Sequence, residues 1–121
     1  TPALLLECEL DFQQASDSAF LQELELMQPF GAGNAEPVFA SPELTVVDRS
    51  PLGYSGDHVR LRLKDSASGI TLMAKGWNMA TAFPPSSVGS RIRVAYTPRL
   101  DYYRGVASID VGIKDWQPVA D

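Results

Sequence analysis

Three basic residues alternate with apolar ones in residues 58–64, which spell HVRLRLK. Side chains of a β-strand point to opposite faces in turn, so Arg60, Arg62 and Lys64 should share one face and the apolar residues the other. We call these three cations the basic stripe. Such a row can follow the phosphates of a nucleic acid, but it is also typical of the solvated face of a half-buried strand. The residues alone leave both interpretations open.

Five further residues have side chains that could contact a nucleic acid: Lys75, Trp77, Tyr102, Tyr103 and Arg104. Lys75 and Trp77 share one face of an expected strand, where the indole could stack on a base or be buried in the core. The two tyrosines fall in an expected turn, in which both cannot easily be buried. One of them should therefore be exposed.

Side chains for covalent or metal chemistry are scarce. The chain has one cysteine, Cys8, and one histidine, His58, which are far apart in sequence. A nucleophile needs a base beside it, and a metal site needs several ligands at set spacing. We therefore expect no catalytic residue, metal site or cofactor in this segment, and a structural hydrogen-bonding role for His58.

Charge is divided unevenly along the chain, whose formal net charge is −5. Residues 1–48 contain nine acidic residues and no lysine or arginine, whereas residues 49–121 contain all ten basic residues and only six acidic ones. The overall charge argues against a nucleic-acid partner, but the second part could carry a basic surface. The acidic first part could face another domain or solvent.

Length and composition indicate one globular domain, because 121 residues with 45% hydrophobic and 21% charged residues suffice for a single core. No apolar run approaches the roughly 20 residues that span a bilayer, so we expect no membrane contact. A single cysteine excludes a disulfide within the chain and fits a cytoplasmic location. The absence of an initiator methionine suggests a piece of a longer protein.

The elements that would position these side chains are mostly strands. Residues 4–10 could form a short strand, and Phe20, Leu21, Leu24 and Met27 have helical spacing after possible capping residues at 16–18. Five strands are then expected, over residues 38–50, 58–64, 70–77, 91–100 and 106–116. Five strands with a link between the third and fourth are the order of an OB-fold Greek-key barrel. We expect an N-terminal strand, helix and connector over 1–36 and the barrel over 37–121.

One motif makes a family resemblance specific. Residues 29–39 read PFGAGNAEPVF, which resembles the signature PFGxGNxxPxF of the RecJ family, where the nuclease core passes into its OB domain. Supporting likenesses are HVRLRL at 58–63, AKGWN at 74–78, YRG at 103–105 and IDVGIKDW at 109–116. The family usually has phenylalanine where this chain has Trp77, which favours burial there.

The resemblance implies a single-stranded-DNA-binding OB module of a 5′-to-3′ exonuclease that uses Mn²⁺ or Mg²⁺. The catalytic DHH motif of that family is absent from this chain, so the module would position substrate for nuclease domains upstream in the same polypeptide. The groove of an OB-fold lies across its second and third strands, between the loops that join strands one to two and four to five. This places the basic stripe, Lys75 and Trp77 on the groove, and Tyr102, Tyr103 and Arg104 in a flanking loop.

A structural role is the main alternative. In that case the barrel would close the parent nuclease, or dock a partner such as single-strand binding protein, with little DNA contact of its own. The acidic first part of the chain supports such a role. An independent enzyme is disfavoured, because no nucleophile–base pair, metal cluster or phosphate loop is recognisable.

Overall fold

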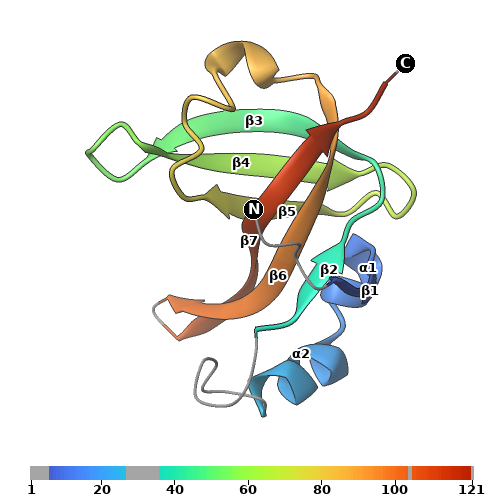
Figure 1. The fold of residues 1–121 in the computed structure, drawn as a ribbon. Coiled ribbons are helices and arrows are strands. Elements are labelled where there is room, and N and C mark those ends of the chain that lie inside the picture. Colours follow the sequence, from blue (N-terminus) through green and yellow to red (C-terminus); the bar gives the residue numbers. More distant parts are fainter. Residues whose placement is uncertain (1–5, 27–35, 104, 121) are drawn as a thin grey trace.

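The computed structural model describes residues 6–26, 36–103 and 105–120. Its elements, in chain order, are β1 (Leu6–Glu9), α1 (Phe12–Ala15), α2 (Ser18–Glu25), β2 (Val38–Ala40), β3 (Leu44–Leu52), β4 (His58–Asp65), β5 (Thr71–Gly76), a 3₁₀ helix (Pro85–Ser87), β6 (Arg91–Tyr103) and β7 (Val106–Pro118). Figure 1 shows the strands wrapped around one another, with α1 and α2 at one end of the barrel. Neither α-helix in this part of the chain has the length or apolar character needed to cross a bilayer.

Five strands close into a barrel. β4 pairs antiparallel with β3 and β5, β5 runs parallel to β7, and β7 pairs antiparallel with β6, which returns to β3. This ring confirms the expected OB-fold. The sheet nevertheless has seven strands rather than five. The predicted strand 38–50 is divided around Pro42 into β2 and β3, and β1 adds a further strand beside β2.

Alternating burial along the strands confirms the predicted core. Val59, Leu61 and Leu63 of β4 are completely buried, while the stripe residues between them face outward. On β6, the alternate apolar residues Ile92, Val94 and Tyr96 are also buried. Because successive side chains of a strand point to opposite faces, the alternating pattern determines which face is apolar. This part of the core therefore follows directly from the sequence.

The N-terminal segment contributes a plug to one end of the barrel. The one-turn helix α1 has Asp11 as its N-cap. The Asp11 side chain accepts a hydrogen bond from the Gln14 amide, and the Gln14 side chain accepts one from the Asp11 amide. Phe12 is completely buried and meets the Tyr96 ring edge-to-face, with centroids 5.9 Å apart. The predicted helix is α2, which is capped by Asp17 and ends at Glu25. The expected helix residue Met27 and the motif residues 29–35 lie outside the described part of the chain.

Three buried polar side chains hold this segment against the barrel. Asp65 accepts hydrogen bonds from the Phe12 and Ala67 amides, both at 3.1 Å. The Tyr96 hydroxyl donates to the Leu10 carbonyl at 2.6 Å, and burial raises the pKa of Tyr96 above its usual range. Thr97 Oγ1 donates to the Pro37 carbonyl, also at 2.6 Å. A buried polar group without a partner is costly, so these bonds fix where the segment lies.

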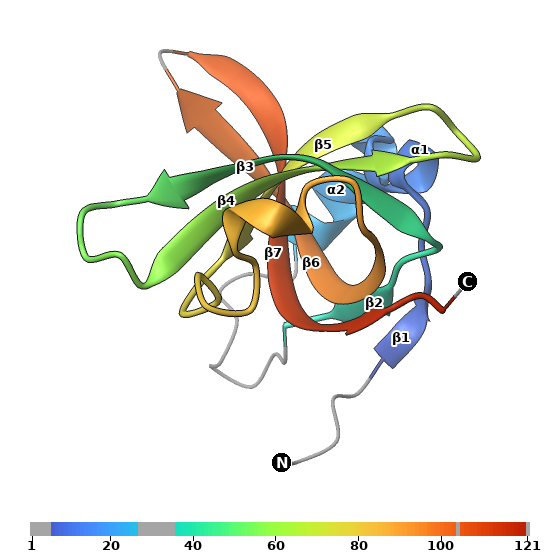
Figure 2. The same ribbon diagram turned by 90° about the horizontal axis from the view of Figure 1, so that it is seen from above.

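Two of the hairpins extend from one side of the barrel. Figures 1 and 2 show that the β3–β4 and β6–β7 hairpins project toward the same side of the molecule in both views. The expected turn at residues 101–105 is shorter than predicted, because β6 continues to Tyr103 and pairs Tyr102 with Ala107 and Tyr103 with Val106. Tyr102 and Tyr103 are therefore strand residues rather than turn residues. We call the outer part of this hairpin, residues 99–103 and 105–110, the arm.

Candidate nucleic-acid interface

The basic stripe runs along the outer face of β4, as its alternation predicted. Arg62 and Lys64 are exposed and Arg60 is half-buried. The cross-strand neighbours of the stripe are polar or charged apart from one methionine: Thr45, Asp48 and Ser50 on β3, and Thr71, Met73 and Lys75 on β5. We call the outward side of β3, β4 and β5 that these residues cover the outer face.

The stripe residues form no ion pair within the described ranges, although Asp48 of β3 lies directly opposite Arg62. The Nε atom of Arg60 is buried and has no hydrogen-bond partner within the same ranges, and Arg60 lies directly opposite another cation, Lys75. The unbalanced charges of Arg62 and Lys64 would gain from an anion placed on this face.

Lys75 differs from the stripe because it has an acidic partner. Its Nζ lies 3.3 Å from the carboxylate of Asp110 on the adjacent β7. Burial raises the pKa of Asp110 above its ordinary value, although Lys75 opposes the shift. The structure therefore places Lys75 on the predicted face, but with much of its charge compensated.

Trp77 stands at the end of the outer face beyond β5. Its side chain is 53% exposed, so the expectation of burial, taken from phenylalanine at this position in the family, is wrong. The chain leaves the sheet after Gly76, and Asn78 adopts a left-handed conformation with φ of 61°. This turn keeps the indole outside the barrel, where it contacts His58 with ring centroids 4.9 Å apart. The hydrogen-bonding role expected for His58 is also observed, since it accepts from the Asn78 amide at 2.9 Å.

The arm carries the remaining predicted residues away from the stripe. Tyr102 is 61% exposed and shares a face of the β6–β7 ribbon with Leu100, which lines a hollow beside α2. Asp110, the partner of Lys75, has the opposite parity and belongs to the other face of the ribbon. The structure thus brings the stripe, Lys75 and Trp77 together but does not bring Tyr102 to them. The Tyr103 side chain and Arg104 lie outside the described part of the structure.

Sequence analysis missed a fully exposed aromatic residue, Tyr54. It lies in the β3–β4 hairpin and has the full exposure of an isolated side chain. Gly53 and Gly56 on either side have φ angles of 76° and 84°, a conformation that side-chain-bearing residues rarely adopt. The signal was present, because a tyrosine between turn glycines has no core to enter. In an OB-fold this hairpin is one of the two loops that flank the groove.

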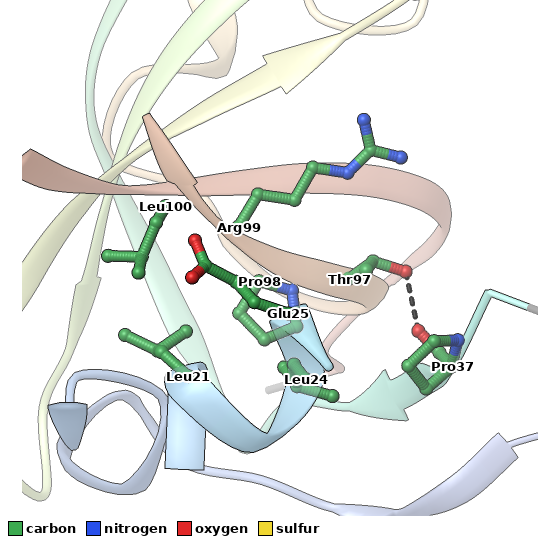
Figure 3. A pocket seen from close by; sticks show the side chains of 8 residues that line it. All are labelled: Leu21, Leu24, Glu25, Pro37, Thr97, Pro98, Arg99 and Leu100. Carbon is green, nitrogen blue, oxygen red and sulfur yellow. Dashed lines mark hydrogen bonds between the residues drawn. The ribbon is translucent and has the colours of Figure 1, made fainter. Parts of the chain in front are cut away.

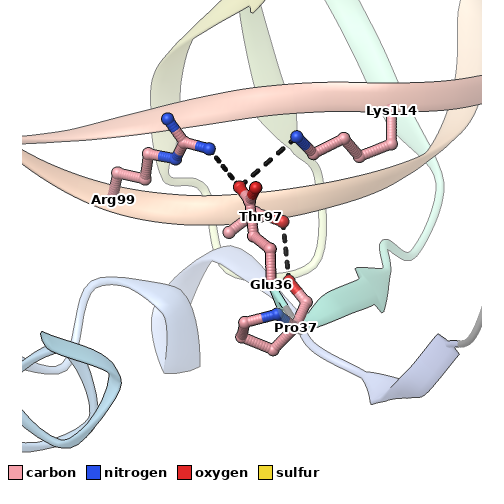
Figure 4. Close-up of polar contacts among 5 residues, drawn as sticks. All are labelled: Glu36, Pro37, Thr97, Arg99 and Lys114. Carbon is pink, nitrogen blue, oxygen red and sulfur yellow. Dashed lines mark hydrogen bonds and ion pairs between the residues drawn. The ribbon is translucent and has the colours of Figure 1, made fainter. Parts of the chain in front are cut away.

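The cations near the N-terminal segment are neutralised. Glu36 forms ion pairs with Arg99 of β6 and with Lys114 of β7, the latter at 3.3 Å (Figure 4). Burial alone would raise the pKa of Glu36, but hydrogen bonds and attraction from the two cations outweigh it and lower the pKa. Arg91 likewise lies 3.2 Å from Glu43.

The hollow between α2 and β6 is too small to be a ligand site. It has room for about one water molecule, and the guanidinium group of Arg99 points away from it (Figure 3). Its lining residues are Leu21, Leu24, Glu25, Pro37, Thr97, Pro98, Arg99 and Leu100. Within the described ranges, no three His, Cys, Asp or Glu side chains are grouped so that they could hold a metal ion.

Comparison with known proteins gives the same family as the motifs. Residues 6–115 match the RecJ OB domain family. The chain is 25% identical over 112 residues to the single-stranded-DNA-specific exonuclease RecJ of Haemophilus influenzae, covering 90% of this chain and 19% of that protein. Crystal structures of Thermus thermophilus RecJ with Mn²⁺ and with Mg²⁺ match with TM-scores of 0.57 at 26% and 28% identity, over 83% and 82% of this chain and 14% of those chains. The chain thus spans less than a fifth of these relatives, and it belongs to the RecJ OB domain family.

Proposed function

We propose that this domain binds single-stranded DNA on its outer face and positions the strand for the nuclease domains of a RecJ-like 5′-to-3′ exonuclease. The observation that carries the proposal is the pair of exposed cations, Arg62 and Lys64, which have no ion-pair partner in the described structure. They lie on the sheet face that ends at the half-exposed indole of Trp77. Cations that track phosphates and an aromatic ring that stacks on a base are the two elements of single-strand binding by OB-folds.

In this mechanism the stripe and Lys75 bind the phosphates, and Trp77 stacks on a base. Stacking is possible on every base, so binding should be largely independent of sequence. Tyr102, Tyr103 and Arg104, on the arm, would contact only a part of the strand that extends beyond the outer face. The upstream nuclease domains would carry out the metal-dependent cleavage, and single-strand binding protein would be a further partner of the parent enzyme.

The test is a fluorescence-anisotropy titration of a labelled single-stranded oligonucleotide with the 121-residue chain at low and moderate salt. A duplex of the same sequence serves as the control ligand. We expect preference for the single strand and a loss of affinity with salt. The double variant Arg62→Ala/Lys64→Ala should reduce the salt slope by about 1.4, since each lost phosphate contact removes about 0.7 for single strands.

Arg93→Ala is the charge-matched control for the single variant Arg62→Ala, since each removes one exposed cation. Arg93 is also exposed, but it lies on β6, where it pairs with Gln117; β6 borders neither β4 nor β5. Its removal should leave affinity nearly unchanged. Equal losses in the two variants, or no binding at tens of micromolar protein at low salt, would reject the outer face as a DNA site.

A structural role is the second candidate, and it is favoured by the way the N-terminal segment enters the barrel. Phe12 is fully buried, and its amide is held by Asp65 of β4. A segment fixed in this way could hold the barrel in a set orientation to a preceding domain. Under this alternative, Arg62→Ala/Lys64→Ala would have no effect on DNA binding.

A further inference from the structure

The turn that carries Trp77 is tied to the start of β4 by one side chain, His58. The Asn78 amide donates a hydrogen bond to His58 Nδ1 at 2.9 Å. The imidazole also meets the Trp77 indole at an interplanar angle of 68°, with ring centroids 4.9 Å apart. His58 therefore contacts both the ring of Trp77 and the backbone immediately after it.

The same turn is constrained on its other sides. A side chain at Gly76 would lie 3.0 Å from a Val59 methyl group and 3.2 Å from Met79, so the backbone passes close to the barrel wall here. The Ala80 amide donates to the Asp57 carbonyl at 3.1 Å, which joins this turn to the β3–β4 hairpin. These contacts hold the backbone at both ends of the turn, while the indole between them remains half exposed.

The hydrogen bond from the Asn78 amide stabilises a backbone conformation that is unfavourable for a residue other than glycine. Asn78 is the only residue other than glycine with a positive φ in the described ranges, and such a conformation persists when its surroundings favour it. To accept the bond, Nδ1 must carry no proton, so the neutral ring carries its proton on Nε2. A residue that fills the same space as His58 but has no acceptor atom at this position could not form the bond.

We propose that His58 is a positioning residue for Trp77: its Nδ1 acceptor fixes the left-handed turn at Asn78 and so sets the direction of the indole. This rests on the proposed function, since the indole matters only if it stacks on DNA bases. His58 itself need not touch the strand. Its loss should loosen the indole in the free protein and weaken single-strand binding as a consequence.

Two substitutions separate the hydrogen bond from the ring contact. His58→Phe retains an aromatic ring against Trp77 but has no acceptor. His58→Asn loses the ring, but its side-chain oxygen can take the position of Nδ1. Both are made with Trp116→Phe, so that Trp77 is the only tryptophan. Acrylamide quenching of its fluorescence, without DNA, then reports the freedom of the indole directly.

We expect His58→Phe to raise the quenching of Trp77 toward that of free tryptophan. It should also lower single-strand affinity by about three- to tenfold, which is part of the affinity that stacking on one base contributes. His58→Asn should remain close to the parent in both measurements. Unchanged quenching in His58→Phe, or equal disturbance by the two substitutions, would overturn the positioning role.

Amide hydrogen exchange of the unsubstituted chain tests the inference even if a variant does not fold. The Asn78 amide should be protected although Asn78 is exposed; exchange at the rate of a free amide would overturn the proposal. Failure of the DNA-binding function has a different signature. In that case Trp77→Ala would leave affinity unchanged, while His58→Phe would still alter the quenching.

Discussion

The two sides of the barrel differ in how far their polar groups are satisfied. Where the N-terminal segment packs, Asp65 and Tyr96 have hydrogen-bond partners, and Glu36 binds two cations. On the outer face, Arg62 and Lys64 have no ion-pair partner among the described residues. Polar groups that already have partners stabilise the fold, whereas polar groups without partners gain the most free energy from a bound ligand. The net charge of −5 conceals this difference because it averages the two sides.

The largest effect is expected on the satisfied side, from Asp65→Ala. Asp65 is fully buried and accepts from two backbone amides, so its removal should lower the free energy of unfolding by about 3 kcal/mol. The exposed Asp57→Ala is the control and should change it by less than about 0.5 kcal/mol. Urea unfolding of both variants measures the difference. Similar midpoints would mean that Asp65 does not hold the segment in place.

A smaller effect should follow from Glu36→Gln, which weakens the ion pairs with Arg99 and Lys114. The loss in free energy of unfolding should be about 0.5–1 kcal/mol at neutral pH, because both cations are partly exposed. The pKa of Glu36 is lowered by folding, so its contribution is present above the ordinary value of 4.5 and is lost as pH falls through the folded-state pKa. The difference between variant and parent should therefore shrink on acidification. A difference that is constant with pH would contradict the ion pairs as its source.

The smallest effect tests the boundary between the two sides, where Lys75 is held by Asp110. Asp110→Asn should release Lys75 to the outer face, raise single-strand affinity about two- to threefold, and steepen the salt slope by about 0.7.

Folding raises the pKa of Asp110, so its contribution to stability is lost as pH rises through that pKa. Acidification should also neutralise Asp110 earlier than an ordinary carboxyl, and parental affinity should then approach that of the variant. An unchanged salt slope in the anisotropy titration would show that Lys75 does not reach the DNA.

The sequence predicted the barrel better than it predicted the ends of its strands. Strict alternation in residues 58–64 determined the inward face of β4, and the outward cations followed from it. The helix α1 was not predicted, because four residues are too few to display a helical period. The predicted strand 38–50 is two strands in the structure, with Pro42 in the boundary between β2 and β3.

The missing parts of the candidate site depend on contacts between distant segments. Lys75 meets Asp110 only because β5 and β7 run parallel in the closed barrel, and no local pattern contains that pairing. The exposure of Trp77 depends on the left-handed turn at Asn78, which the sequence does not mark with glycine. Arg49 has inward parity at the end of the barrel and donates to the Phe83 carbonyl at 2.7 Å, so this cation has a structural role that alternation alone did not predict.

The plug formed by the N-terminal segment limits how this module can be transplanted between proteins. The first barrel strand begins at Leu44, so a graft designed from the sheet alone would start near that point. Such a graft would leave behind Phe12 and the carbonyl that receives the Tyr96 hydroxyl, and it would open one end of the barrel to water. The transferable unit therefore includes the residues from Leu10 onward. Fusion and recombination breakpoints that respect this unit should yield folded chimaeras, and those that fall between α1 and β2 should not.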